Sequence, residues 1–275
     1  MKKIPAFFKP LPCLSPGKSL LLRILMVPNF FLTRAQGMEN LCRGEGAKIY
    51  AFNHNNSLEA LLVPVFIMYS LGGSAISFVI DWMYGKIPII GNLMEMTEPV
   101  YVYHKRSRIP WIKKERRHLP PNNVIEQCAG KLRSGQSIGI FPEGKRNRNP
   151  EHLMKGRPGI GHIALLTGVP VIPVGIDFNS RTARNRIPVI GRIILRAGRP
   201  LHFRKESDEY RNILALDVGN RKEWPELHRL AEDVTHEIML SLSGLSGKKY
   251  NHPCPELTDN RRKRTRKLEE QPCPV

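Results

Sequence analysis

Short apolar runs that suit buried strands alternate with helix-length segments along most of this chain. Turn residues such as Gly, Pro and Asn separate the two kinds of segment. This alternation is typical of an α/β domain with a mostly parallel sheet flanked by helices, which is the fold class we predict. The predicted strands span residues 47–52, 75–80, 100–103, 137–141, 169–176 and 191–198.

Helix start and stop signals predict four main helices between and after these strands. The first has Ser57 as a candidate N-cap and Gly72 as its stop, with a kink expected at Pro64. The third is rich in small residues and the last is amphipathic. The four helices span residues 58–71, Asn122 or Asn123 to Gly135, 158–168, and a stretch within 222–245.

The charge of the chain predicts an anionic partner. Its 275 residues carry a formal net charge of +19, and the pI is about 10.0. This charge suits nucleic acid, an acidic membrane surface or a phosphorylated small molecule. The hydrophobic fraction of 41% is enough for a substantial core. Composition thus indicates a globular protein and leaves the partner open.

The five cysteines are scattered along the chain and form no C-x-x-C pair. This pattern predicts neither a disulfide framework nor a zinc site. We expect reduced thiols in a cytoplasmic compartment and no bound metal.

The N-terminal region contains an apolar stretch, residues 19–32, that Arg23 and Pro28 interrupt. No run of about 20 apolar residues occurs, so a conventional membrane-spanning helix is not expected. Lysines and prolines also break the pattern of a cleaved signal peptide. We interpret residues 1–40 as a membrane-interface segment, with a core helix as the open alternative for residues 19–32.

The last part of the chain has the composition of a tail. Residues 247–275 contain four prolines and the basic run RRKRTRK at 261–267. Such a segment is typical of a disordered basic arm. The folded domain is therefore predicted to span residues 41–246.

The first polar cluster is NHNNSLE, residues 53–59, which follows the first predicted strand. Reactive groups in α/β sheets gather in loops beyond the carboxyl ends of strands. His54 precedes the next helix, so Glu59 in its first turn can fold back and accept a hydrogen bond from the imidazole. The other ring nitrogen is then available as a general base. The plain alternatives are a turn histidine and a glutamate favoured by the helix dipole.

The second cluster is FPEGKRNRN, residues 141–149, which follows the predicted strand 137–141. It combines one carboxylate and a glycine with three cations, a set of donors that suits a phosphate. Neither loop contains a nucleophile in a recognisable elbow. The chemistry therefore points to base-assisted direct transfer, in which His54 takes a proton from a hydroxyl that attacks an activated acyl carbonyl. A solvated basic turn is the plain alternative.

Three motifs together resemble the lysophospholipid acyltransferase family, which is typified by 1-acyl-sn-glycerol-3-phosphate acyltransferase. The family signature is N-H-x-x-x-x-D, then F-P-E-G-T-R-S, then a V-P-[VI]-x-P strand. The matching residues are Asn53, His54 and Glu59, then FPEGKR at 141–146, and VPVIP at 169–173. Their order and separation also match, and the resemblance covers roughly residues 40 to 200.

The resemblance implies roles for residues of the first two motifs. His54 is the catalytic base, and Glu59 holds it. The second loop contacts the phosphate of the acceptor, with a weaker candidate in the segment between the two loops. The implied substrate-binding residues are Glu143, Gly144, Lys145, Arg146 and Arg106.

The resemblance also implies the substrates and the fold. The donor is an acyl thioester such as acyl-CoA or acyl-carrier protein, and the expected acceptor is 1-acyl-sn-glycerol-3-phosphate. No cofactor is implied beyond these substrates. The implied fold is glycerolphosphate acyltransferase-like, with an interfacial helix before it and the basic tail after it.

The chain departs from the family pattern at three positions. Glu59 stands where the family usually has Asp, and Lys145 and Asn147 replace the usual Thr and Ser. These changes put the exact acceptor in doubt and are consistent with a less common substrate or with weakened activity. A catalytically silent membrane-binding relative therefore remains an alternative.

A nucleic-acid-binding protein is the alternative from another class, favoured by the net charge and by the tail. The sequence contains no helix-turn-helix, zinc-finger or RNP pattern, so we expect no nucleic-acid partner. Several cationic regions flank the predicted site, and each Lys or Arg near an anionic leaflet contributes about 1 kcal/mol. We expect a peripheral or monotopic protein on the cytoplasmic face of a membrane.

Overall fold

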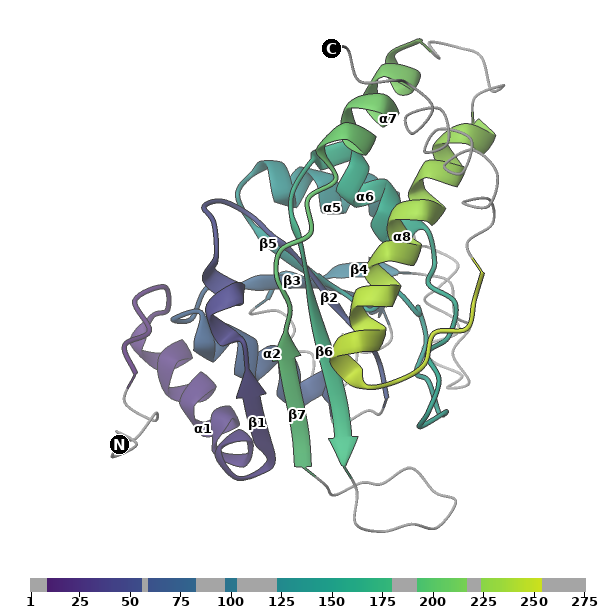
Figure 1. The fold of residues 1–275 in the computed structure, drawn as a ribbon. Coiled ribbons are helices and arrows are strands. Elements are labelled where there is room, and N and C mark those ends of the chain that lie inside the picture. The colour runs from purple at the N-terminus through teal and green to yellow at the C-terminus, as the bar shows by residue number, and fades with distance from the viewer. Residues whose placement is uncertain are drawn as a thin grey trace, which may run out of the picture.

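A computed structural model describes residues 9–55, 59–82, 97–102, 123–179, 192–216 and 224–253. Within these ranges the chain forms one seven-stranded sheet in the order β1-β7-β6-β2-β5-β3-β4 (Figure 1). The strands are β1 (Thr33–Gln36), β2 (Ile49–Phe52), β3 (Ile76–Asp81), β4 (Val100–Val102), β5 (Ser137–Ile140), β6 (Val171–Asn179) and β7 (Arg192–Ala197).

The sheet is parallel at every pairing except one, the antiparallel pair of β6 and β7. β2 lies at the centre, where Ile49 is aligned with Ile138 of β5 on one side and with Val171 of β6 on the other. All four residues of β2 are buried. Continuous apolar runs are typical of parallel strands that helices cover on both faces. The prediction of a mostly parallel α/β fold is confirmed.

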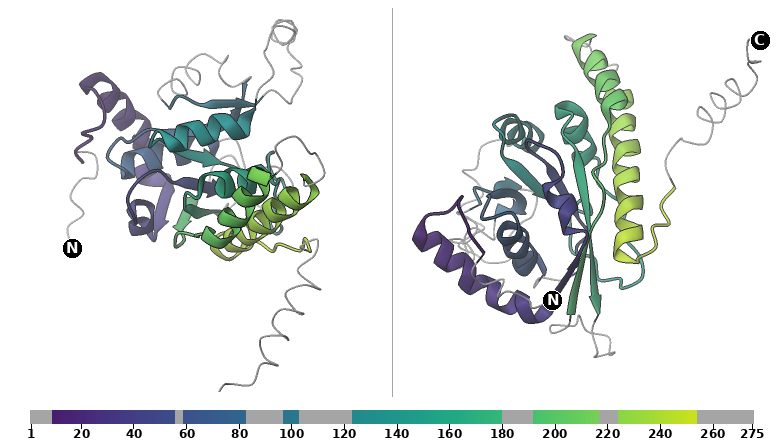
Figure 2. Two further views of the ribbon diagram at one scale, coloured as in Figure 1. Left: turned by 90° about the horizontal axis from the view of Figure 1, so that it is seen from above. Right: turned by 60° about the vertical axis from the view of Figure 1, so that its left-hand side comes forward.

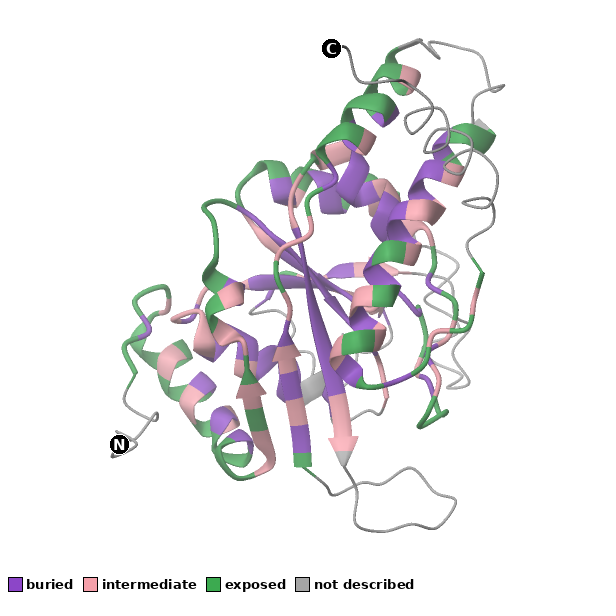
Figure 3. Ribbon diagram, in the orientation of Figure 1, coloured by how far each residue is buried: buried purple, intermediate pink, exposed green. Residues whose placement is uncertain are grey.

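Helices cover both faces of the sheet (Figures 1 and 2). They are α1 (Pro16–Leu32), the 3-10 helix η2 (Met38–Cys42), α2 (Glu59–Ser70), α5 (Val124–Arg133), α6 (Gly159–Thr167), α7 (Arg204–Leu216) and α8 (Trp224–Ser246). One buried cluster joins the sheet to α5, α6, α7 and α8, and a second joins the opposite face to α2 and η2. The strands in the middle are the most deeply buried part of the domain (Figure 3).

All four predicted helices form, with shifted ends. α2 continues through Pro64, and Asn123 caps α5 by accepting a hydrogen bond from the backbone N–H of Glu126 at 3.3 Å. Three further elements, β1, η2 and α7, were not expected. β1 is a short, polar edge strand, and its residues alternate between half-buried and exposed.

The apolar N-terminal stretch forms α1, which is buried on one side only. Leu22 and Met26 pack against α2, and the Asn29 side-chain amide donates to the backbone carbonyl of Leu62 at 3.2 Å. On the other side Ile24 is 56% exposed and Phe31 is 80% exposed. In the part of the chain that the structure describes, no helix is long and apolar enough to cross a membrane. α1 thus packs as a core helix while exposing an apolar face.

The chain after α8 differs from the predicted tail at its beginning. Residues 247–253 return along the domain, and Tyr250 packs against the main hydrophobic cluster. Lys248 is only 8% exposed. The predicted boundary at residue 247 therefore falls too early, because buried contacts extend beyond the end of the helix. Residues 254–275, with the RRKRTRK run, lie outside the described residues.

Candidate active site

The two polar loops predicted to carry the chemistry lie side by side at the carboxyl ends of β2 and β5. These strands are neighbours in the sheet. The backbone N–H of His54 donates to Glu143 Oε1 at 3.0 Å, and the backbone N–H of Asn147 donates to the carbonyl of His54 at 2.8 Å. The structure thus brings the imidazole-bearing loop and the cationic loop together, as the sequence predicts.

Asn53 fixes the position of the first loop. Its side chain is fully buried and pairs with the backbone of Ile176 on β6, accepting from the N–H at 2.6 Å and donating to the carbonyl at 2.8 Å. A side-chain amide can make both contacts because it carries a donor and an acceptor in the geometry of a peptide group. Sequence reasoning gave Asn53 no role, although its place directly before His54 was visible.

Glu59 closes the first loop from the start of α2. The side chain is completely buried, and its carboxylate accepts hydrogen bonds from the backbone N–H of Asn55 at 3.1 Å and from the Asn55 amide at 3.2 Å. Glu59 therefore folds back onto the residue that follows His54. The His54 ring packs against Phe141, with ring centroids 4.8 Å apart. The direct contact between His54 and Glu59 that defines the dyad stays a prediction.

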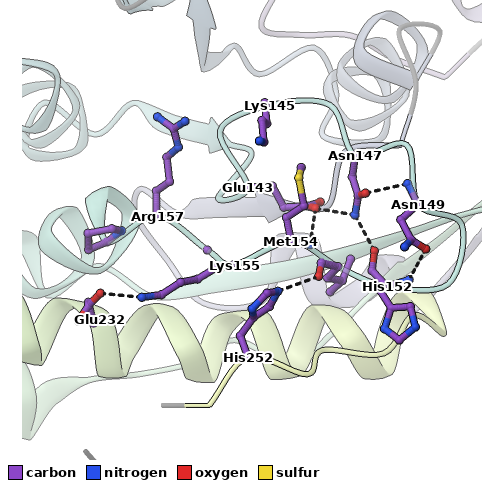
Figure 4. Close-up of a pocket in the computed structure, with 13 residues that line it drawn as sticks. Glu143, Lys145, Asn147, Asn149, His152, Met154, Lys155, Arg157, Glu232 and His252 are labelled. Atoms are coloured by element: carbon purple, nitrogen blue, oxygen red, sulfur yellow. Dashed lines mark hydrogen bonds and ion pairs between the residues drawn. The ribbon is translucent and has the colours of Figure 1, made fainter. Parts of the chain in front are cut away.

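Glu143 links the two loops and does not face the solvent. It is 2% exposed and accepts a hydrogen bond from the backbone N–H of His54. It also accepts from the amide of Asn147 at 2.8 Å and from the backbone N–H of Met154 at 2.9 Å (Figure 4). Burial raises the pKa of this carboxyl, and the three hydrogen bonds and Lys248 oppose the shift. Because both carboxylate oxygens are engaged by the protein, Glu143 fits a positioning role better than the acceptor contact that the resemblance implies.

The contacts of Asn147 show why an asparagine, and not the serine that is usual in the family, suits this position. Its amide donates to Glu143 and, at 2.7 Å, to the carbonyl of His152, while its Oδ1 accepts from the backbone N–H of Asn149 at 2.9 Å. A serine hydroxyl has a single donor and cannot make all these contacts. The asparagine therefore stabilises the internal structure of the second loop.

Gly144 precedes two cations of the second loop and lies against a third cation, Arg157. Lys145 is exposed and Arg146 is half-buried. Gly144 has a φ of +66°, and a Cβ at this position would lie 2.5 Å from Nε of Arg157. A glycine is needed here both for the backbone conformation and for the close approach of that guanidinium. Arg157, which sequence reasoning missed, thus adds a cation to this loop, whereas Arg106 lies outside the described residues.

A groove with a volume of about 630 Å³ opens beside this loop (Figure 4). The residues that line it include Glu143, Lys145, Lys155, Arg157 and His252. Lys155 is paired with Glu232 of α8 at 3.1 Å. The cations Lys145, Lys155 and Arg157 give this groove a lining that suits a phosphate, although neither His54 nor Arg146 lines it.

Similarity to known proteins covers the part of the chain that contains both loops. The family described as Acyltransferase matches residues 33–177, which include both loops. Two curated relatives align over 147 residues, or 53% of this chain. They are "1-acyl-sn-glycerol-3-phosphate acyltransferase BAT2, chloroplastic" of Brassica napus, at 30% identity, and "1-acyl-sn-glycerol-3-phosphate acyltransferase LPAT1, chloroplastic" of Arabidopsis thaliana, at 29%.

The aligned part spans 37% of the Brassica protein and 36% of the Arabidopsis protein. Among solved structures, the crystal structure of the 1-acyl-sn-glycerophosphate (LPA) acyltransferase PlsC from Thermotoga maritima superposes with a TM-score of 0.49 at 17% sequence identity. That superposition covers 82% of this chain and 83% of PlsC.

Proposed function

This chain belongs to the Acyltransferase family, and we propose that it transfers a fatty acyl group from an acyl thioester to the free hydroxyl of a lysophospholipid. The proposed donor is acyl-CoA or acyl-carrier protein. The proposed acceptor is 1-acyl-sn-glycerol-3-phosphate, which agrees with the names of the two plant relatives. The observation that carries the proposal is the direct hydrogen bonding between the His54 loop and the cationic loop, because one acceptor can then reach a base and several cations at once.

His54 acts as the general base in this reaction. Its ring takes the proton from the acceptor hydroxyl while the hydroxyl oxygen attacks the carbonyl carbon of the thioester. The carbon–sulfur bond then breaks, and the departing thiolate takes the proton from the imidazolium. The products are an ester and a thiol. Glu59 is proposed to accept a hydrogen bond from the ring and to stabilise the imidazolium that forms.

The cationic loop holds the phosphate of the acceptor. Arg146 and Arg157 present planar guanidinium groups that can each donate two hydrogen bonds to a phosphate, and Lys145 adds a mobile point charge. Holding the phosphate fixes the acceptor hydroxyl next to the base, which lowers the entropic part of the barrier. The proposal needs no cofactor beyond the two substrates.

Replacing Arg146 by alanine is expected to raise the KM for the lysophospholipid and to leave the KM for the thioester nearly unchanged. A hydrogen bond to a charged group contributes about 1.5–3 kcal/mol, so the rise should be roughly 10-fold to 100-fold. Steady-state kinetics with each substrate varied in turn measure both constants. Arg133→Ala is the matched control, because Arg133 is exposed and lies at the end of α5 that precedes the start of β5, whereas the second loop follows the end of that strand. A larger change in the thioester KM would reverse the assignment of the loop.

The proposed activity is tested by incubating the purified full chain with a thioester labelled in its acyl group and with vesicles that contain one lysolipid from a panel. We expect labelled phosphatidate from the lysophosphatidate vesicles. Absence of labelled lipid with every acceptor and with both donor types would contradict the proposal. Salt-sensitive binding of nucleic acid without any turnover would instead favour the nucleic-acid-binding alternative.

We propose that α1 lies in the interface of a membrane, at its cytoplasmic face, and brings the site to its lipid substrate. The support is the exposed apolar face of the helix, which includes Leu20, Ile24 and Phe31, together with Lys18 and Arg23 on the same helix. Apolar side chains of such a helix insert below the headgroups while its cations contact anionic lipids. The net charge of +19 adds attraction to an anionic leaflet.

The double variant Ile24→Asp/Phe31→Asp is expected to bind anionic vesicles at least about 100-fold more weakly, because burying each apolar side chain contributes about 1.5–3 kcal/mol. Both residues are exposed, so the fold should persist. Cosedimentation with phosphatidylglycerol-containing vesicles measures the partition. Leu214→Asp on α7 is the matched control, since Leu214 is also an exposed apolar residue. Equal binding of the double variant and this control would exclude α1 as the attachment.

A further inference from the structure

The chain that follows α8 returns to the active-site loops. Gly247 has a φ of +73° and turns the chain, and the next residues run beside the end of the second loop. The backbone N–H of Lys249 donates to the carbonyl of Glu151 at 2.8 Å, and that of Leu153 donates to the carbonyl of Lys249 at 2.9 Å. This return segment, residues 247–253, lies outside the part of the chain that matches the family.

Close packing of α8 on β6 fixes where the return segment begins. A Cβ at Gly175 would lie 2.5 Å from the backbone carbon of Leu245, so only a glycine allows the helix end to approach so closely. The guanidinium of Arg196 on β7 also donates to the carbonyl of Leu245 at 2.9 Å. Gly175 immediately precedes Ile176, the residue that Asn53 clamps. The end of α8 is therefore held at the same end of the central strands as His54.

The end of α8 places the side chain of Lys248 in a buried position beside the second loop. This lysine is 8% exposed, and its ammonium donates to the backbone carbonyl of Asn149 at 2.9 Å. Burial lowers the pKa of Lys248, and the carboxylates of Glu143, Glu59 and Asp177 oppose the shift. Asp177 is also paired with Arg196 at 3.5 Å, whereas Glu143 and Glu59 are almost fully buried. The ammonium thus contacts the second loop directly, and carboxylates from both active-site loops and from the end of β6 act on it as nearby charges.

We propose that Lys248 is a positioning residue of the active site. Its hydrogen bond to Asn149 holds the end of the second loop, and its charge offsets the buried carboxylates of Glu143 and Glu59. Glu143 accepts a hydrogen bond from the backbone N–H of His54, and Glu59 accepts one from the backbone N–H of Asn55, so the two carboxylates together hold the main chain at His54. The role of Lys248 in turnover rests on the proposed acyl transfer, but its role in loop structure does not.

The charge of Lys248 offsets a cost of burying carboxylates in the active site. Burial without a counter-ion favours the protonated form of a carboxyl group. A protonated Glu143 has fewer acceptor positions for its three donors. With Lys248 present, the positive charge lowers the pKa of Glu143 and so helps its carboxylate to keep its three donors. Without it, the main chain around His54 loses its fixed position.

The test compares Lys248→Met with Lys249→Met in the full chain. The two lysines are adjacent, but Lys249 is exposed and contacts the second loop only through its backbone. For Lys248→Met we expect kcat to fall by roughly 10-fold to 100-fold, because a small displacement of reacting groups has effects of this size. The acid limb of the pH–rate profile should move up by about one unit, since loss of a nearby positive charge favours the protonated forms of the site. Lys249→Met should match the unmodified chain in both respects.

Amide hydrogen exchange gives a second readout that needs no enzyme activity. The N–H groups of His54 and Met154 donate to Glu143, so they should exchange at least about 10-fold faster in Lys248→Met and at the ordinary rate in Lys249→Met. If the unmodified chain transfers no acyl group, the proposed function fails, and exchange still tests the loop role. If the chain is active but Lys248→Met keeps its kcat, its pH profile and its amide protection, Lys248 is only a buried tether.

Lys248→Arg covers the case in which Lys248→Met does not fold. It keeps the charge in a larger group, so the acid limb should stay where the unmodified chain has it, even if kcat falls. An acid limb that moves although the charge is retained would overturn the electrostatic part of the proposal.

Discussion

Replacing His54 by alanine is expected to reduce kcat for acyl transfer by about 100-fold to 10,000-fold, which is the range that general-base catalysis contributes. The alanine removes the only group of the first loop that we assign to proton transfer. The fold should persist, because the loop is held mainly by the backbone of His54 and by Asn53, which the substitution leaves in place. Initial rates with saturating substrates, together with a thermal unfolding curve, measure both effects.

Two companion variants make the His54 result interpretable. His202→Ala should behave like the unmodified chain, because His202 is exposed and lies far from the active-site end of the strands. It follows Leu201, which pairs with Val171, the first residue of β6. Glu59→Gln should lower kcat less than His54→Ala does, since it weakens the stabilisation of the imidazolium without removing the base. Full activity of His54→Ala would exclude His54 as the base, and an unchanged rate for Glu59→Gln would leave Glu59 as a residue of the helix start.

Replacing Glu143 by glutamine is expected to lower both the activity and the stability. The carboxylate accepts three hydrogen bonds, and a glutamine amide turns one acceptor oxygen into a donor that faces another donor. A buried donor left without an acceptor costs about 1–3 kcal/mol of folding free energy. The displaced His54 loop should lower kcat on the order of 100-fold. Urea unfolding and initial rates at saturating acceptor measure the two losses.

Glu151→Gln is the matched control for Glu143→Gln. Glu151 lies in the same stretch of chain, but its side chain is exposed and its described hydrogen bonds use the backbone. We expect no change in kcat or in the free energy of unfolding for this variant. If Glu143→Gln instead raised only the KM for the acceptor and kept kcat, the acceptor contact implied by the family resemblance would be the better description of Glu143.

Sequence patterns predicted the central strands and both active-site loops. β2 and β5 are short apolar runs because helices cover both of their faces, and this burial is visible in composition alone. The loop residues could be found because reactive groups collect where such strands end. Because β2 and β5 are parallel neighbours, the loops that follow them, with His54 and Glu143, lie at the same end of the sheet.

The parts that the sequence did not predict depend on tertiary contacts. β1 is a polar edge strand, so its residues carry little of the apolar pattern by which buried strands are recognised. The antiparallel direction of β7 depends on how the chain returns after β6, which the side chains of the strand do not encode. Lys248 and Lys249 are identical residues in the sequence, and only the end of α8 makes one of them buried.

The roles of charged residues were the least visible from sequence. Glu143 lies in a cationic loop, which suggested a contact with the acceptor, yet its carboxylate is turned inward toward three protein donors. Arg157 is distant in sequence from Lys145 and reaches the same loop only because Gly144 leaves room for it. Whether a charged side chain binds a ligand or holds a loop depends on its direction, and residue type does not report direction.

The most direct measurement compares lysophosphatidate with the corresponding monoacylglycerol as acceptor, using the same donor and the same vesicles. The two acceptors share the reacting hydroxyl, and only the first has a phosphate for the cationic loop. If base and cations act on one molecule, kcat/KM should be at least about 100-fold higher for lysophosphatidate, and Arg146→Ala should remove most of that preference. Equal kcat/KM values for the two acceptors with the unmodified chain would contradict a site in which His54 and the cationic loop bind a single phosphorylated alcohol.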